Sequence, residues 1–89
     1  MKSTLRIVFY GTPEFAVPAL DILLKNNFDV VAVVTAPDRP SGRGQKIVSS
    51  EVKDYAVEHQ IPVLQPVKLK HESFLSELKS LQPDLQIVV

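Results

Sequence analysis

Leu5–Pro13 reads LRIVFYGTP, a run of strand-forming apolar residues that ends at a single glycine. A nearly continuous apolar run is typical of a parallel strand that is covered on both faces. Gly11 allows a sharp turn and Pro13 cannot continue a strand, so a helix is expected directly afterwards. Ligands of doubly wound sheets bind beyond the carboxyl ends of the strands. We therefore predict that Gly11, Thr12, Pro13 and Phe15 form the rim of a substrate site.

Strands and helices alternate along the rest of the chain. Apolar residues at helical spacing predict helices over 14–26 and 71–81, and another that begins at a Ser49 or Ser50 cap. Further apolar, β-branched runs predict strands over 30–35, 63–65 and 85–89. The residues expected to face inward from these helices are Phe15, Ala16, Ala19, Leu20, Ile22, Leu23, Leu24, Val52, Tyr55, Ala56, Phe74, Leu75, Leu78 and Leu81. The prediction is an α/β fold: a Rossmann-like parallel sheet, βαβαβαβ, with strand order 3-2-1-4.

Composition limits the class of protein. The chain has 89 residues, enough for one small domain, and its ten basic and ten acidic residues cancel. Attraction to nucleic acid or to a membrane must therefore be local. The absence of cysteine excludes disulfides, thiol nucleophiles and thiolate metal sites, and we predict no metal site. No apolar run approaches the ~18 residues of a membrane span. We expect a cytoplasmic protein without membrane contact.

The end of the chain carries an expectation of its own. The strand over 85–89 finishes at the last residue, with no helix after it to cover it. Domains seldom end in this way, so we interpret residues 1–89 as a domain that is truncated after its fourth strand. Such a strand would be left as a sheet edge, and we expect self-association through it.

Two common nucleotide sites do not match the first turn. A dinucleotide fingerprint needs three glycines there and an acid at the end of the second strand. This turn has Gly11 alone, and Thr35 and Ala36 stand where the acid would be. The phosphate-binding loop of nucleoside triphosphatases is also excluded, because no Gly-Lys-Ser or Gly-Lys-Thr occurs.

Residues 36–46 form a basic, proline- and glycine-rich segment that is too long for an ordinary connection between a strand and a helix. Arginine binds phosphate in a bidentate manner, lysine adds a point charge, and glycine permits close backbone approach. A solvated surface loop explains the composition equally well, and both interpretations stay open at this point. The candidate phosphate- or RNA-binding residues are Arg39, Gly42, Arg43, Gly44 and Lys46.

Other polar residues carry weaker signals. His59 and His71 have no acid at a catalytic spacing, and a structural surface role suits both. Thr12 and Phe15 lie at the predicted rim, but packing of the turn and the helix explains them equally well. Neither histidine is therefore assigned a catalytic role.

Three motifs together resemble a known family. They are RIVFYGTPEFAVP at 6–18, VVTAPDRPSGRGQK at 33–46 and IPVLQP at 61–66. In order and spacing they resemble the methionyl-tRNA formyltransferase family over nearly the whole chain. The segment PDRPSGRG is the specific part, since related formyltransferases that act on glycinamide ribonucleotide, amino sugars or folate itself share the first motif but typically lack this segment.

The resemblance implies formyl transfer from 10-formyltetrahydrofolate to the methionine amino group of initiator methionyl-tRNA. It also implies that 37–46 contacts the acceptor arm of the tRNA, chiefly through Arg43. The family's catalytic and folate-binding segments follow the fourth strand, so we expect this chain alone to be inactive and to bind no folate. Two alternatives remain: a free-standing Rossmann-like binding module, and another folate-dependent formyltransferase that acts on a small amine.

Overall fold

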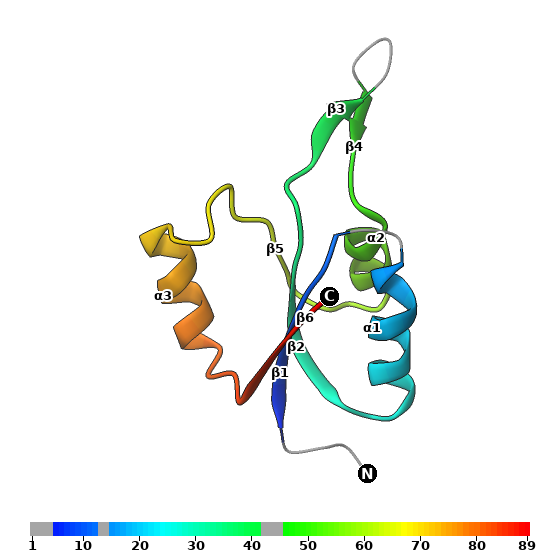
Figure 1. Ribbon diagram of the computed structural model, residues 1–89, viewed down its shortest axis with the longest axis vertical. Coiled ribbons are helices and arrows are strands. Elements are labelled where there is room, and N and C mark those ends of the chain that lie inside the picture. Colours follow the sequence, from blue (N-terminus) through cyan, green and yellow to red (C-terminus); the bar gives the residue numbers. More distant parts are fainter. Residues whose placement is uncertain (1–4, 13–14, 42–45) are drawn as a thin grey trace.

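The computed structural model describes residues 5–12, 15–41 and 46–89, and Figure 1 shows the order of their elements. A helix follows three of the strands, as the alternating sequence pattern predicts. Residues 13–14 and 42–45 lie between described elements. In chain order the elements are β1 (Arg6–Tyr10), α1 (Ala16–Lys25), β2 (Asp29–Val34), β3 (Arg39–Ser41), β4 (Lys46–Val48), α2 (Glu51–Glu58), β5 (Val63–Leu64), α3 (Glu72–Ser80) and β6 (Leu85–Val88).

Four strands form the main sheet, in the order β5-β2-β1-β6. All three neighbouring pairs are parallel. Counting only these strands, the order is 3-2-1-4, so the predicted Rossmann-like topology is confirmed. β1 lies in the interior of the sheet, and Ile7, Val8 and Phe9 are buried there. This burial accounts for the apolar run with which the chain begins.

Helices cover both faces of the sheet (Figure 1). α1 and α2 pack on one face, where Phe9 of β1 and Val33 of β2 join the larger core cluster. α3 packs on the other face through Phe74, which contacts Val8 and Val34 in a smaller cluster. The described helices are all too short, or not apolar enough, to cross a membrane.

Several helix faces differ from the prediction. Phe15 and Ile22 are 70% and 60% exposed, whereas Ala16 and Leu20 are buried. The prediction that Phe15 and Ile22 face inward is therefore wrong. α1 is apolar on almost every side, so its periodicity alone allows several orientations. The contact between α1 and the end of β1 selects one of them.

The two other helices show smaller differences. Leu75 of α3 is exposed rather than inward, while Phe74 is buried as predicted. Tyr55 of α2 is only partly buried, and its hydroxyl donates a hydrogen bond to Asp21 Oδ1 of α1 at 2.5 Å. The aromatic ring thus joins two helices at the margin of the core. Ser50 caps α2 by accepting a hydrogen bond from the backbone N–H of Lys53. It is one of the two serines that were predicted as the cap of this helix.

The basic segment contains regular structure that the sequence analysis does not predict. β3 and β4 pair antiparallel, with Arg39 opposite Val48 and Ser41 opposite Lys46. We call residues 39–48 the arm; its two strands, β3 and β4, extend from the main sheet on the side where β1 and β2 end (Figure 1). Prolines and glycines are poor strand formers, which concealed the hairpin in the sequence.

Candidate functional site

A cavity of about 350 Å³ opens at the carboxyl ends of β1, β2 and β6. The chain winds from β1 towards β2 on one side and reaches β6 on the other, so the sheet changes direction beside β1. Ligands of open parallel sheets bind at this kind of position. The residues that line the cavity are Tyr10, Gly11, Thr12, Val34, Thr35, Ala36, Pro66, Leu69, Val88 and Val89.

Gly11 is required at the cavity because α1 approaches β1 closely there. A Cβ added at Gly11 would lie 2.9 Å from Ala16 Cβ and 3.0 Å from Phe9 Cε2. The backbone of Gly11 is not in the left-handed region, so space rather than conformational freedom excludes a side chain. The sequence identifies the residue correctly, but its physical reason comes from the tertiary contact.

Three hydroxyl groups join the ends of β1 and β2 to α2. Thr12 Oγ1 lies 3.3 Å from Thr35 Oγ1, and Thr35 Oγ1 lies 2.7 Å from Ser50 Oγ. Thr12 Oγ1 also accepts a hydrogen bond from the backbone N–H of Ala36 at 3.1 Å. Thr35 is 5% exposed, and these partners satisfy its buried hydroxyl. The chain of hydroxyls therefore fixes the floor of the cavity relative to the first turn of α2.

The predicted rim residues have different outcomes in the structure. Gly11 and Thr12 line the cavity, whereas the strongly exposed Phe15 does not. Pro13 lies outside the described residues. Thr35 and Val88 were missed, although the rule that ligands bind at strand ends applies equally to β2 and β6. Leu69 lies in a connection whose position no local sequence pattern indicates.

The predicted basic residues are divided between the arm and the segment that joins its strands. Arg39 begins β3 and is exposed. Lys46 begins β4, and its backbone pairs with that of Ser41. Gly42, Arg43 and Gly44 lie outside the described residues, so their predicted role stays a prediction.

Asp38, directly before the arm, is held by a side chain of α2 and by that of Gln65, the residue after β5. Lys53 Nζ of α2 lies 2.5 Å from Asp38 Oδ2, and Gln65 Nε2 donates to Asp38 Oδ1 at 2.8 Å. The same Gln65 nitrogen donates to the carbonyl oxygen of Ala36 at 3.1 Å. The hydrogen bonds from Lys53 and then Gln65 lower the pKa of the Asp38 carboxyl group. No local sequence pattern relates Asp38 to Lys53 or Gln65.

Replacing Lys53 with methionine will raise the pKa of Asp38, because the largest cause of its lowering is then removed. The carboxyl resonance of Asp38, followed by NMR through an acid titration, measures the change. The stabilisation from the ionised pair is present above the ordinary pKa of aspartate and is lost as the pH falls through the lower folded-state value. Lys53→Met will therefore reduce the loss of stability on acidification.

The control for this titration is Lys25→Met. Lys25 pairs with Asp21 at 2.9 Å on the surface of α1 and belongs to a different ion pair. Its replacement will raise the pKa of Asp21 and leave that of Asp38 unchanged. An Asp38 pKa that is equal in the parent chain and in Lys53→Met would contradict the ion pair.

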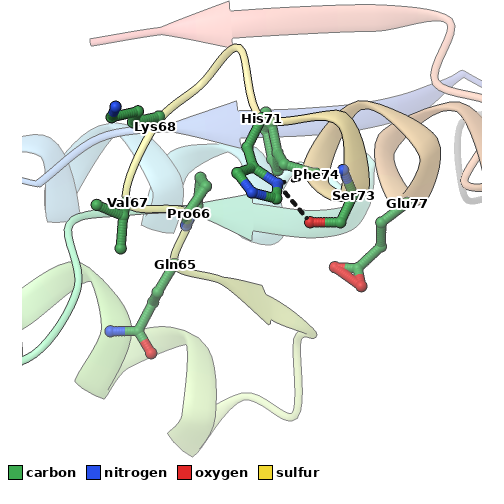
Figure 2. Close-up of a pocket in the computed structure, with 8 residues that line it drawn as sticks. All are labelled: Gln65, Pro66, Val67, Lys68, His71, Ser73, Phe74 and Glu77. Carbon is green, nitrogen blue, oxygen red and sulfur yellow. Dashed lines mark hydrogen bonds between the residues drawn. The ribbon is translucent and has the colours of Figure 1, made fainter.

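A second cavity, of about 420 Å³, lies beside α3 (Figure 2). His71 caps α3, and its Nδ1 lies 2.8 Å from Ser73 Oγ and accepts from the Ser73 N–H. Gln65, at the opposite side of the cavity, points away from His71 and Phe74 in Figure 2. That orientation fits the hydrogen bonds of Gln65 to Asp38 and Ala36. The contacts of His71 are those of a helix cap, as the structural interpretation of this histidine predicted.

The described residues that line the strand-end cavity offer apolar surface, hydroxyl groups and backbone. Burial raises the pKa of Tyr10, and its hydroxyl donates to Gln86 Oε1, so this group stays protonated. Within the part of the chain that the structure describes, no carboxylate, imidazole, lysine or arginine side chain lines this cavity. Among all described residues, no three histidine, aspartate or glutamate side chains gather to hold a metal ion. The cavity can shape and orient a ligand, but its described residues offer no general base near neutral pH.

Comparison with known proteins gives consistent matches. Residues 5–89 match the protein family described as formyl transferase. A protein of Flavobacterium johnsoniae named methionyl-tRNA formyltransferase is 62% identical over 96% of this chain and 27% of its own length. Proteins of the same name from Bacteroides fragilis and Ectopseudomonas mendocina are each 56% identical, over 99% and 100% of this chain. The chain spans 27–28% of the length of these curated relatives.

Proposed function

Because the chain belongs to the formyl transferase family, we propose that it is the N-terminal part of an enzyme that formylates initiator methionyl-tRNA in translation initiation. The formyl donor is 10-formyltetrahydrofolate, and the acceptor is the amino group of the methionine. The observation that carries the proposal is the 51–62% identity to proteins named methionyl-tRNA formyltransferase over nearly every residue of this chain. A tRNA substrate also places the enzyme in the cytoplasm.

The arm supports a nucleic acid as the acceptor rather than a small amine. Its strands extend from the main sheet where β1 and β2 end (Figure 1), three residues after Ala36 of the strand-end cavity, and its sequence carries Arg39, Arg43 and Lys46. Basic side chains on an extended hairpin can bind phosphates at a distance from the reacting group. A small amine would need no such extension. The overall charge of zero makes this local concentration of positive charge the feature that attracts RNA.

Formyl transfer requires attack of a neutral amine on the formyl carbon, through a tetrahedral intermediate with an oxyanion. The described residues of the strand-end cavity supply no acid–base side chain for this step and no cationic side chain for the anionic tail of a folate. We therefore assign neither catalysis nor donor binding to the described residues of this chain. Their proposed contribution is to shape the acceptor side of the site through Gly11 and Thr12 and to carry the arm.

The test is a formylation assay with the full-length enzyme that contains this chain. Purified enzyme, 10-formyltetrahydrofolate and charged initiator tRNA will yield formylmethionyl-tRNA. Free methionine and amino sugars serve as small-amine acceptors under the same conditions. Preferential formylation of a small amine would indicate another folate-dependent formyltransferase. Binding of a ligand without formylation of any acceptor would favour the binding-module alternative.

The 89-residue chain alone will be inactive in the same assay, because its described cavity offers no general base. The measurement is the yield of formylmethionyl-tRNA after long incubation at high protein concentration. The full-length enzyme, diluted until its activity is just detectable, sets the limit of the assay. Formylation above that limit by the 89-residue chain would show that its own residues catalyse the reaction.

We further propose that the 89-residue chain associates with itself through β6. This strand lies at an edge of the described sheet, and Leu85, Val88 and Val89 are exposed. An exposed apolar edge strand is a template for pairing with another chain. Sedimentation equilibrium at tens of micromolar will therefore detect dimers. Val88→Lys will shift the chain towards monomer, whereas Val67→Lys, at a position that is also strongly exposed but lies away from the sheet edge, will not. A parent chain that stays monomeric would contradict the proposal.

A further inference from the structure

The arm receives little support from the hydrophobic core. The side chain of Ile47 in β4 is 67% exposed, and Val48, Arg39 and Pro40 are exposed as well. A two-stranded hairpin is at best marginally stable by itself. The hydrogen bonds between its strands do not set its orientation relative to the rest of the protein. The direction of the arm must therefore be set where its two ends meet the body.

Both ends of the arm are attached to neighbouring residues of α2. Before β3, the Asp38 carboxylate accepts from Lys53 Nζ at 2.5 Å and from Gln65 Nε2 at 2.8 Å. After β4, the Ser49 hydroxyl donates to Asp54 Oδ1. Lys53 and Asp54 are consecutive, so the first turn of α2 holds both ends. We call Asp38, Ser49, Lys53, Asp54 and Gln65 the clamp.

The clamp is continuous with the strand-end cavity. Ala36 lines the cavity; its N–H donates to Thr12 Oγ1, and its carbonyl oxygen accepts from Gln65 Nε2. Ser50 Oγ accepts from the Lys53 N–H at 3.0 Å and lies 2.7 Å from Thr35 Oγ1. The Gln65 side chain thus contacts both the floor of the cavity and the base of the arm. Lys53 contacts Ser50 through its backbone N–H and the base of the arm through its side chain. A rotation of the arm would have to break several of these bonds together.

The ion pair between Lys53 and Asp38 in the clamp is less exposed to solvent than an ordinary surface pair. The side chains of Lys53 and Asp38 are 24% and 29% exposed, whereas that of Lys25, in the Lys25–Asp21 pair, is 74% exposed. Exposed pairs gain little because solvent screens them and both side chains lose freedom. Lys53 and Asp38 are better shielded, and Gln65 fills a second acceptor position of the carboxylate.

We infer that the clamp holds the arm at one orientation relative to the strand-end cavity, and that Asp38, Lys53 and Gln65 are positioning residues for the acceptor. This inference rests on the proposed function for the identity of the acceptor, an RNA that carries the reacting amine. Phosphate contacts on the arm then place the end of the RNA at the cavity. Loss of the clamp leaves those contacts available but adds an entropic cost to every productive encounter.

The first test measures the orientation of the arm without reference to activity. The chain has no cysteine, so Ile22→Cys and Ile47→Cys supply two exposed sites for spin labels, on α1 and on the arm. Pulsed electron paramagnetic resonance will give a narrow distance distribution in this background. Adding Lys53→Met or Gln65→Leu will broaden or shift this distance distribution. Adding Lys53→Arg or the control Lys25→Met will leave the distribution unchanged. An unchanged distribution in both Lys53→Met and Gln65→Leu overturns the inference.

The second test uses steady-state kinetics of the full-length enzyme. In Lys53→Met the KM for methionyl-tRNA will rise roughly five- to tenfold, with kcat and the KM for the formyl donor nearly unchanged. Lys53→Arg will restore the KM for tRNA, which general destabilisation would not explain. A broader distance distribution in Lys53→Met together with an unchanged KM for tRNA would overturn the inference that the clamp positions the acceptor. A parent enzyme that formylates no tRNA refutes the proposed function instead, while the spin-label distances still decide whether the clamp orients the arm.

Discussion

Replacing Gly11 with alanine will lower the free energy of unfolding by about 2 kcal/mol, and Gly11→Val will lower it further. The added Cβ meets Ala16 Cβ at 2.9 Å and Phe9 Cε2 at 3.0 Å. Neither neighbour can move easily, since Ala16 has no flexible end and Phe9 is fully buried in the core. Alanine restricts the unfolded chain and would by itself stabilise the protein by about 0.4–1 kcal/mol. The cost of overpacking is larger than this gain, so Gly11→Ala destabilises the protein overall.

The measurement is urea unfolding followed by circular dichroism, with the slope and the midpoint both determined. The control is the double variant with Gly11→Ala and Ala16→Gly, which removes the nearest clash. Ala16 lies at the first position of α1, where glycine is less costly than in a helix interior. The double variant will be more stable than the sum of the two single changes predicts. A Gly11→Ala chain that unfolds at the parent's urea midpoint would show that α1 does not press against this glycine.

In the full-length enzyme, Arg43→Ala will reduce kcat/KM for methionyl-tRNA by about one to two orders of magnitude. Arg43 lies between Gly42 and Gly44 in the segment that joins β3 to β4, furthest along the chain from the clamp at both ends. A charge-assisted contact to phosphate contributes about 1.5–3 kcal/mol, and its loss raises the free energy of the transition state by that amount. Arg39, which pairs with Val48 at the base of the arm, and Lys46 will contribute less.

Lys79→Ala on α3 is the matched control. It removes one positive charge from an exposed site on the face of the sheet that α1 and α2 do not cover. The salt dependence of tRNA binding separates a phosphate contact from a structural effect. Loss of one phosphate contact lowers the slope of log Kd against log salt concentration by somewhat less than one. Arg43→Ala with the parent's kcat/KM, or with no greater loss than Lys79→Ala, would remove the arm from acceptor binding.

The main sheet could be predicted from the sequence because its signals are local. The buried run of β1, the β-branched run of β2 and the capping serine of α2 each depend on residues that are close together in the chain. Short connections and the right-handed crossover rule then leave few possible strand orders. For the same reason Gly11 and Thr12 could be placed correctly at the edge where ligands bind. Phe15 was placed there by the same rule, but it does not line the cavity.

Tertiary structure decided the features that depend on distant partners. α1 and α3 carry more apolar side chains than one face can bury, so contacts with the sheet determined that Ile22 and Leu75 are exposed. The pairing of β3 with β4 overrides the weak strand propensity of a segment rich in proline and glycine. The clamp joins Asp38 to side chains 15 and 27 residues away. The sequence by itself thus determined the strands of the main sheet, their order and the helices between them. Only the folded chain determined which side chains meet, because packing and hydrogen bonding act between residues that local patterns do not relate.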